Sequence, residues 1–284
     1  MIKKHKNKND YLINDGVFVR DLTKPNVTPI DINNLYSKND YQTLLTNEQI
    51  NHSKKYVSLD HETIKLSKVI IISDGFEFDK VHKELYKMPK DVAIIGVNGA
   101  LKNWKLVGKD CPDEYKKAMN YYVVNNPYEE CTWFLPRTHL YFPRCIASSK
   151  TNHEFLKRYQ SEIKYIYNSA LDNDYSGVGA TGFNKFDDYR NPICAALSLS
   201  YSFGAKKIAI LCHDETSKDF KEGMIKTEAG NYCYPQQMKS KLFIEGMCYW
   251  LNRDDIKIAC NSKSLFLNNT EYIESENLVN FFEE

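Results

Sequence analysis

The stretch KVIIISDGFEFDKVHKEL (residues 68–85) joins an uninterrupted apolar run to a glycine turn and an amphipathic segment. Its four consecutive aliphatic residues at 69–72 are typical of a strand covered on both faces of a parallel sheet. The spacing of Val81, Leu85 and Met88 predicts a helix over 79–88. The turn between them, residues 73–77, lies where α/β proteins present backbone amides to an anion, yet it carries two carboxylates.

The same alternation of buried strands and helices continues along the chain. Asn191 is a good N-cap for a helix over 193–203, because Pro192 then occupies the first helical position. Apolar runs predict strands at 91–97, 121–124, 208–212 and 256–259 and a helix over 236–252, with one or two further strands within 132–148. The stretch 152–167 is compatible with a helix or a strand. This order predicts an α/β, Rossmann-like, mainly parallel sheet with helices on both faces.

The first part of the chain has a different composition. Residues 1–67 are rich in Asn, Lys and Asp with only short apolar patches, which indicates an irregular or partly helical N-terminal extension. A small hairpin or an assembly contact is compatible with it, and homo-oligomerisation stays open. We therefore expect the nucleotide-binding domain to span 68–284, preceded by this extension.

Composition excludes several classes of protein. The 38 basic and 37 acidic residues nearly cancel, so no overall field favours nucleic acid or a membrane surface. No apolar run approaches the roughly 18 residues of a membrane span, and no signal peptide is evident. The eight cysteines form no C-x-x-C pair, which favours reduced, buried thiols in a cytoplasmic protein. No P-loop, H-E-x-x-H motif or nucleophile elbow is present.

Polar residues follow the predicted strands at the points where those strands end. In open parallel sheets, ligands bind outside the carboxyl ends of the strands. This rule selects four loops: 73–77, Asn98-Gly99, Asn125-Asn126 and His213-Asp214. We expect them to converge on one edge of the sheet.

The chain resembles a known superfamily through its glycine turn, "GVNGAL" (96–101), "VVNNP" (123–127) and "NPICAALSLSYSFGAKKIAILCHDE" (191–215), in that order. These segments look like the Rossmann-type group that holds bacterial CMP-sialic-acid sialyltransferases, flagellin-modifying motility accessory proteins and archaeal 6-hydroxymethylpterin pyrophosphokinase-like proteins. The likeness covers roughly 68–214. The family's usual G-x-G-P-S turn reads Ser73-Asp74-Gly75-Phe76-Glu77 here, and its late histidine base has no counterpart after His213.

The resemblance implies a nucleotide-activated donor and a set of residues that contact it. Ser73, Asp74 and Gly75 would form the nucleotide-phosphate turn, while Asn98 with Gly99, and Asn126, would contact the donor. Asp214 would be the acidic residue after the late strand, and Tyr232 and Tyr234 lie where tyrosines hold the leaving phosphate. Each of these roles is implied by the resemblance alone.

Other candidates come from residue chemistry. Asp74, Glu77 and Asp214 are oxygen ligands of the kind that Mg²⁺ uses with phosphates, although carboxylates in such a turn also cap free amides. His213 is a candidate general base next to Asp214, but neighbours on a strand point to opposite faces. Thr181, in a glycine-rich loop, and Asn191 are candidate ligand contacts, with turn and capping roles as the alternative.

Three functions fit these residues. The first is a transferase that uses a nucleotide sugar, resembling a sialyltransferase in its glycosyl transfer to an acceptor. The second is Mg²⁺-dependent pyrophosphoryl transfer from ATP, as in the pterin-kinase-like branch. The third is a non-catalytic relative with a binding role, because fold alone does not determine function.

Overall fold

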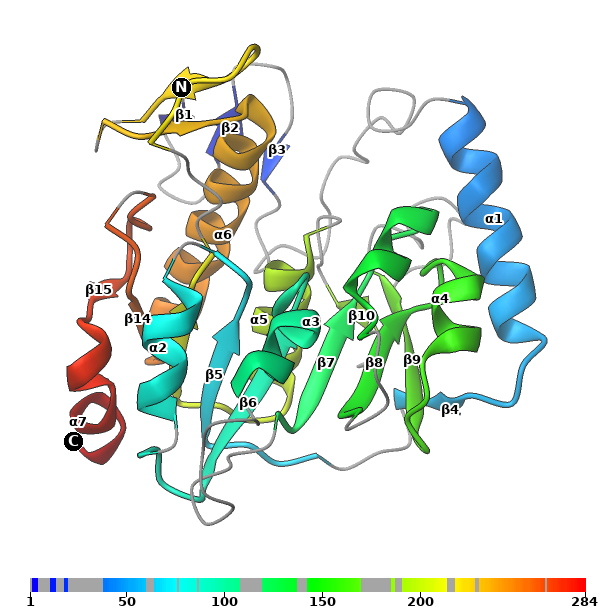
Figure 1. Cartoon of the computed structure of the whole chain (residues 1–284), viewed down its shortest axis with the longest axis horizontal. Coiled ribbons are helices and arrows are strands. Elements are labelled where there is room, and N and C mark those ends of the chain that lie inside the picture. Colours follow the sequence, from blue (N-terminus) through cyan, green and yellow to red (C-terminus); the bar gives the residue numbers. More distant parts are fainter. Residues whose placement is uncertain are drawn as a thin grey trace.

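A computed structural model describes residues 2–4, 11–13, 18–19, 38–59, 64–75, 77–85, 87–107, 119–136, 142–169, 185–186, 191–213, 218–227, 230–263 and 265–284. Within these residues, ten strands form one sheet in the order β10-β9-β8-β7-β6-β5-β11-β14-β15, with β4 also paired to β9 (Figure 1). Every pairing in this sheet is parallel. The predicted α/β fold with a parallel sheet is therefore confirmed.

Six strands, β5, β6, β7, β8, β11 and β14, form where the apolar runs predicted them, whereas β4, β10 and β15 were not predicted. The sheet consists of β4 (Val57–Ser58), β5 (Lys68–Ile72), β6 (Val92–Val97), β7 (Tyr121–Val124), β8 (Arg144–Ser148), β9 (Lys164–Ser169), β10 (Lys185–Phe186), β11 (Lys207–Leu211), β14 (Lys257–Cys260) and β15 (Glu271–Tyr272). The described residues of the stretch 132–148 hold one strand, β8, and the first part of the stretch belongs to the 3₁₀ helix η4 (Glu129–Phe134). The undecided stretch 152–167 contains a helix followed by a strand.

Helices cover both faces of the sheet, as predicted, and each face has its own core. On one face α5 (Pro192–Ser202) and α6 (Pro235–Arg253) pack on residues such as Val69, Ile71 and Ile95. On the other face lie α2 (Phe78–Leu85), α3 (Ala100–Val107), α4 (His153–Arg158) and α7 (Leu278–Glu283), with η6 (Ser275–Asn277) leading into α7. Ile70 and Ile72 point to that second face, so β5 is buried on both sides.

Part of the predicted N-terminal extension packs on this body. Helix α1 (Lys38–His52) contacts α4, and β4 adds to the sheet beside β9 (Figure 1). A separate antiparallel sheet comprises β1 (Ile2–Lys4), β2 (Tyr11–Ile13) and β3 (Phe18–Val19). The domain boundary at residue 67 stays a prediction.

Two further expectations concern the cysteines and membrane spans. Seven of the cysteines belong to the described residues, and all seven are free and buried. Burial of the thiols is confirmed for these seven, whereas Cys111 lies outside the described residues. None of the helices in the described part of the chain combines the length and apolarity that a bilayer crossing requires.

The order of the strands changes direction between β5 and β11. From β5 the chain proceeds through β6, β7, β8 and β9 to one side, then crosses back through α5 to β11 on the other side of β5. The loops that leave the carboxyl ends of β5 and β11 therefore diverge. A crevice for a ligand is expected at such a topological switch point.

Candidate functional site

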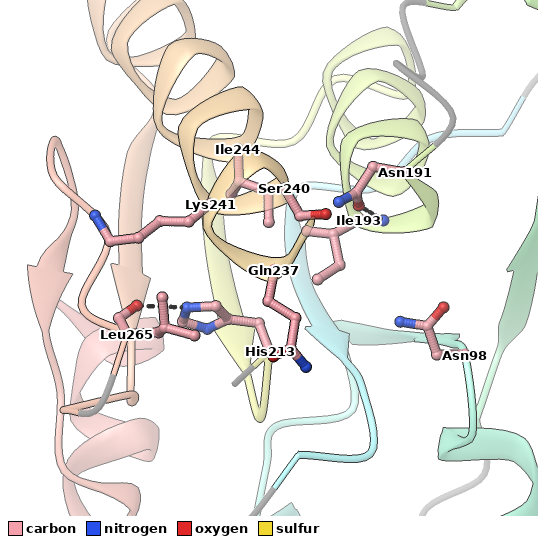
Figure 2. Close-up of a pocket in the computed structure, with 9 residues that line it drawn as sticks. All are labelled: Asn98, Asn191, Ile193, His213, Gln237, Ser240, Lys241, Ile244 and Leu265. Atoms are coloured by element: carbon pink, nitrogen blue, oxygen red, sulfur yellow. Dashed lines mark hydrogen bonds between the residues drawn. The ribbon is translucent and has the colours of Figure 1, made fainter. Parts of the chain in front are cut away.

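A pocket of about 80 Å³ lies at this switch point (Figure 2). The residues that line it come from the loops after β6, β11 and β14, from the start of α5 with its N-cap, and from α6: Asn98, Asn191, Ile193, His213, Gln237, Ser240, Lys241, Ile244 and Leu265. Three of the predicted site residues, Asn98, Asn191 and His213, are thus brought together although they are far apart in the chain. Of the polar loops expected to converge, those of Asn98 and His213 meet in this pocket.

Asn98 links the loops after β5 and β6. Its Nδ2 donates a 3.1 Å hydrogen bond to Ser73 Oγ, which in turn donates to Asp74 Oδ1 at 3.2 Å. The backbone of Asn98 is left-handed, with φ of 50°, a conformation that asparagine tolerates better than most residues. The Tyr122 hydroxyl donates to the Asn98 carbonyl at 2.6 Å. The Asn98 side chain is therefore held in a defined position at the pocket.

Gly99 makes room for Asp74. A Cβ at position 99 would lie 1.9 Å from Asp74 Oδ2 and 2.5 Å from its carboxyl carbon. No side chain larger than that of glycine fits unless Asp74 moves. Gly99 therefore allows the loop after β6 to pack closely against the loop after β5.

The turn after β5 is bonded to the end of β11 through its backbone. The Ser73 N–H donates to the Leu211 carbonyl at 3.0 Å, and the Gly75 N–H donates to the Cys212 carbonyl at 2.8 Å. These two amides are already satisfied, so they do not form the phosphate cradle that the glycine turn suggested. In the described part of the turn, Ser73 is buried and the Asp74 carboxylate is half-buried, so Asp74 is the group that a ligand can contact.

Asn261, which was not predicted from the sequence, follows β14 and bonds to the loops after β11 and β5. Its Oδ1 accepts a 2.9 Å hydrogen bond from the Cys212 N–H, and Cys212 has a left-handed φ of 54°. Its Nδ2 lies 3.5 Å from Glu77 Oε2 and donates to it. The signal in the sequence was a polar residue that follows the strand predicted at 256–259, separated from it only by Cys260.

The predicted metal ligands are not all described. Asp214 lies outside the described residues, while Asp74 and Glu77 bond to Ser73 and Asn261 respectively. In the part of the chain that the structure describes, no three His, Cys, Asp or Glu side chains gather as metal ligands do. A Mg²⁺ ion would need oxygens from a bound phosphate beside these carboxylates.

His213 has a fixed ring orientation. Its Nε2 lies 2.8 Å from the Leu265 carbonyl (Figure 2), and a carbonyl can only accept, so Nε2 carries the proton of the neutral ring. Nδ1 then holds the lone pair. This is the tautomer that allows His213 to accept a proton through Nδ1.

Asn191 is the N-cap of α5, as predicted. Its Oδ1 accepts hydrogen bonds from the N–H groups of Ile193 at 2.8 Å and Cys194 at 3.3 Å. These helix amides are satisfied by the cap, so the group that Asn191 can offer to a ligand is its own Nδ2. Thr181, the other candidate before this helix, lies outside the described residues.

Helix α6 contributes Lys241 to the lining of the pocket, and Figure 2 shows the ammonium group of Lys241 pointing away from Asn98. Lys241 forms an ion pair with Glu245 one turn later, and the two side chains are 16% and 6% exposed. Glu245 Oε1 also accepts a 2.7 Å hydrogen bond from the Asn268 N–H. Lys241 thus lines the pocket with its ammonium group held by a buried carboxylate, a feature that the amphipathic pattern of α6 did not reveal.

The predicted tyrosines lie before the pocket-lining turns of α6. Tyr232 belongs to β13 (Tyr232–Cys233), which pairs with β12 (Ile225–Lys226), and packs edge-on against Phe220. Tyr234 caps α6 and its N–H donates to Gln237 Oε1 at 2.7 Å. Neither tyrosine is among the residues that line the pocket, whereas Gln237 is.

Two asparagines follow β7, and they differ in their partners. Asn126, the predicted contact, accepts a 2.8 Å hydrogen bond from the Tyr128 N–H through Oδ1, which closes the turn. Asn125 is 6% exposed, and its Nδ2 is buried with no hydrogen-bond partner among the residues that the structure describes. The preference for Asn126 over Asn125 came from the family resemblance, and the structure draws attention to Asn125 instead.

A larger hollow of about 640 Å³ lies over the opposite face, between α3, η4 and α4. Its lining includes Lys102, Arg158 and Trp133, which is 72% exposed. It contains none of the predicted site residues and does not lie at the switch point between β5 and β11. We therefore place the functional site in the smaller pocket.

Fold and site together define an α/β protein of Rossmann type with a polar pocket at the switch point of its sheet. The fold is similar to that of the MAf glycosyltransferase from Magnetospirillum magneticum AMB-1, with a TM-score of 0.66 and 12% sequence identity. The similarity covers 84% of this chain and 39% of that protein, so the chain corresponds to well under half of its length. No family model and no curated protein matches the chain.

Proposed function

We propose that this chain is a glycosyltransferase-like transferase that binds a nucleotide sugar in the crevice between β5 and β11. The observation that carries the proposal is the meeting of Asn98, Asn191 and His213 in one pocket at the switch point. The fold shared with a MAf glycosyltransferase supports the reaction class. Transfer of a sialic acid in particular rests on the sequence resemblance.

The pocket offers a group for each step of a glycosyl transfer. The side-chain amides of Asn98 and Asn191 are suited to hydrogen bonds with the donor, and Lys241 would meet the phosphate charge if its side chain turned toward the pocket. In the reaction, the acceptor hydroxyl oxygen bonds to the anomeric carbon while the bond from that carbon to the phosphate oxygen breaks. The hydroxyl proton passes to His213 Nδ1, and the departing phosphate keeps the electron pair. Tyr232 and Tyr234 remain predicted partners of that phosphate.

The alternative is Mg²⁺-dependent pyrophosphoryl transfer from ATP. It is favoured by the two carboxylates, Asp74 and Glu77, in the turn after β5. With a metal bound between them and the phosphates, the ion would neutralise the charge that develops in phosphoryl transfer. Asp214 is the predicted third ligand.

A thermal-shift screen separates these functions. CMP, CMP-sialic acid, UDP, UDP-N-acetylglucosamine, GDP-mannose and ATP are each tested with and without Mg²⁺, because a ligand that binds only the folded state raises the Tm. We expect a CMP or UDP compound to raise the Tm without Mg²⁺. A Mg²⁺-dependent response to ATP alone would support pyrophosphoryl transfer. No response to any compound would overturn both enzymatic proposals.

Asn98→Gly tests whether the observed pocket is the binding site. Glycine accepts the left-handed φ of this position, so the variant removes the side chain without backbone strain. We expect the Kd of the responding nucleotide to rise about tenfold. Asp255→Gly is the matched control, since Asp255 has φ of 58° and is exposed beyond α6. Equal affinities of Asn98→Gly and wild type would place the ligand elsewhere.

A further inference from the structure

The turn that follows β7 is fixed by hydrogen bonds to three of its carbonyl groups. Thr151 Oγ1 donates to the Val124 carbonyl at 3.0 Å, and the Asn152 N–H donates to the Asn126 carbonyl at 3.0 Å. The Pro127 carbonyl accepts from Asn47 Nδ2 at 2.9 Å and from Asn152 Nδ2 at 3.5 Å. Residues from α1 and from the loop after β8 therefore hold this turn in one conformation.

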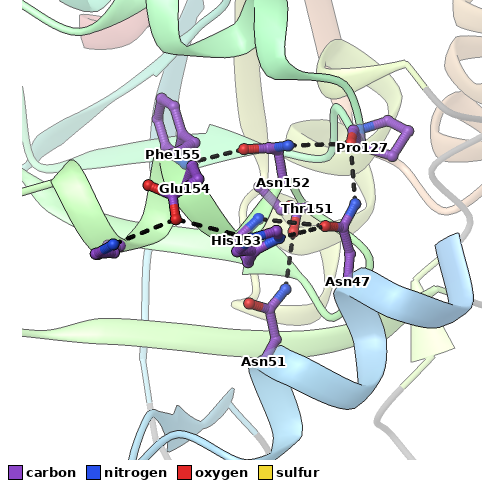
Figure 3. A network of polar contacts seen from close by, with 9 residues as sticks. Asn47, Asn51, Pro127, Thr151, Asn152, His153, Glu154 and Phe155 are labelled. Carbon is purple, nitrogen blue, oxygen red and sulfur yellow. Dashed lines mark hydrogen bonds and ion pairs between the residues drawn. The ribbon is translucent and has the colours of Figure 1, made fainter. Parts of the chain in front are cut away.

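Helix α1 contributes two buried amides to this arrangement (Figure 3). Asn47 and Asn51 are each 2% exposed. While Asn47 Nδ2 binds Pro127, its Oδ1 accepts from His153 Nδ1 at 2.9 Å. Asn51 Nδ2 donates to the carbonyls of Ser149 and Thr151, both at 2.8 Å. A helix outside the predicted nucleotide-binding domain thus fixes loops at the carboxyl ends of β7 and β8.

Asn125 lies within the turn that these residues hold. The side chains of β7 alternate between the two cores, with Val123 facing α5 and Val124 facing the opposite helices. The same alternation continued by one residue directs Asn125 to the α5 side, where Asn191 and Ile193 line the pocket. Strand β7 pairs with β6, whose end carries Asn98. Asn125 is therefore one strand away from a pocket-lining residue on the same edge.

Within the described part of the chain, the amide nitrogen of Asn125 is buried without a hydrogen-bond partner. Leaving a buried donor unsatisfied costs about 1–3 kcal/mol, and such groups are rare in folded proteins. The neighbouring carbonyls are bonded and the turn is braced, so relaxation of the backbone offers this donor no new acceptor. An acceptor supplied by a bound ligand would satisfy it.

We infer that Asn125 is a binding residue, whose Nδ2 donates to an oxygen of the nucleotide donor, and that Asn47 is a positioning residue that holds its turn. This inference rests on the proposed function and adds two residues to it. The acceptor is a carbonyl, hydroxyl or phosphate oxygen, because each of these accepts a hydrogen bond from an amide. Binding would satisfy a donor that the protein has already desolvated and oriented, so little additional ordering is required.

Asn125→Ala is the first variant of the test. Because this change removes an unsatisfied buried donor, we expect the Tm without nucleotide to equal or exceed that of wild type. The Kd for CMP or UDP, measured by calorimetry, is expected to rise about tenfold. Loss of affinity without loss of stability is not the result expected from a residue with a structural role only. A Tm well below that of wild type would overturn the inference.

Asn47→Asp is the second variant. It keeps an oxygen for His153 and removes the donor to the Pro127 carbonyl, and Gln49→Ala on the exposed side of α1 is its control. We expect Asn47→Asp to raise the Kd several-fold in the wild-type background and to have no further effect when Asn125 is alanine. An equal effect in both backgrounds would show that Asn47 does not act through Asn125.

The two proposals fail in different ways. If wild type binds none of the nucleotides, the proposed function and this inference are both overturned. If wild type binds and Asn125→Ala binds equally well, only this inference is overturned, and an ordered water is then the partner of Asn125. If Asn47→Asp does not fold, as judged by circular dichroism, the outcome for Asn125→Ala decides alone.

Discussion

Asn98 Nδ2 donates a 3.1 Å hydrogen bond to Ser73 Oγ, and the two residues stand 25 positions apart in the chain. Ser73 directly follows the buried strand β5, and Asn98 directly follows the buried strand β6. The parallel pairing of these two strands brings the two loops together. This hydrogen bond connects the turn after β5 to Asn98, which lines the pocket. Several consequences of this geometry can be measured.

Gly99→Ala is expected to lower the free energy of unfolding by about 1–3 kcal/mol, since the new Cβ would overlap the Asp74 carboxylate. Urea denaturation measures the effect. The double variant Gly99→Ala/Asp74→Ala should recover part of the loss, because only a 3.1 Å contact to the Asp74 Cβ then remains. Additive losses would show that the two loops do not pack as described.

His213→Gln is expected to reduce kcat by about 10²–10⁴-fold while the Kd of the nucleotide changes little. Glutamine can still donate to the Leu265 carbonyl, so the structural contact is preserved, but it cannot accept a proton as imidazole does. Transfer rates with the nucleotide sugar identified by thermal shift provide the measurement. A fully active His213→Gln enzyme would exclude the general-base role.

Lys241→Met should both destabilise the fold and weaken nucleotide binding. Removing the cation leaves Glu245 buried and unpaired, which costs about 3 kcal/mol in such pairs. Lys241→Met/Glu245→Gln removes the uncompensated charge and keeps an acceptor for the Asn268 N–H. We expect this double variant to regain stability without regaining affinity. Recovery of both would assign Lys241 a purely structural role.

Stability should fall at alkaline pH because buried acids must stay protonated in the folded state. Burial, with a smaller contribution from the Glu130 charge, raises the pKa of Cys131 from 9.0 to about 12. Burial is also the main cause that raises the pKa of Tyr122 well above 10.0 and that raises the pKa of Cys145. A folded pKa above the unfolded one means that the stabilisation is complete below pH 9 and is lost as the pH rises toward 12.

Urea unfolding at a series of pH values measures this loss. Each such group contributes a slope of up to about 1.4 kcal/mol per pH unit between its unfolded and folded pKa. Cys131→Ala should therefore reduce the slope of the stability decline above pH 9 by up to about 1.4 kcal/mol per pH unit, the contribution of one group. A stability that is unchanged from neutral pH to well above 9 would contradict the burial of these groups.

Much of the fold was predictable because side chains that are buried in a sheet or helix are apolar, and they recur in the sequence with the period of that element. The runs 69–72 and 208–212 consist of consecutive apolar residues. As strands they would have apolar side chains on both faces, as expected in a sheet that is covered by helices on both sides. The capping of α5 by Asn191 was equally local, since the cap and its amides lie within three residues. The 3₁₀ helix at 129–134 was missed because six residues with a mixed pattern give no clear period.

The site was predictable only in part, because local sequence does not reveal the partners of polar atoms. The glycine turn suggested free amides, but the Gly75 N–H is bonded to Cys212, which is far away in sequence. Asn125 and Asn126 are the same residue type in adjacent positions, yet one closes a turn and the other keeps an unsatisfied nitrogen. The position of Lys241 depends on its ion pair with Glu245, which in turn accepts a hydrogen bond from Asn268 in the loop after β14.

The sequence by itself determined the parallel sheet and the edge at which polar loops gather, because hydrophobic burial and strand direction depend on patterns within each segment. Tertiary structure alone decided which groups at that edge are available to a ligand. A hydrogen bond requires two atoms within about 3 Å, and at this edge the second atom usually belongs to a strand or helix that is distant in the chain.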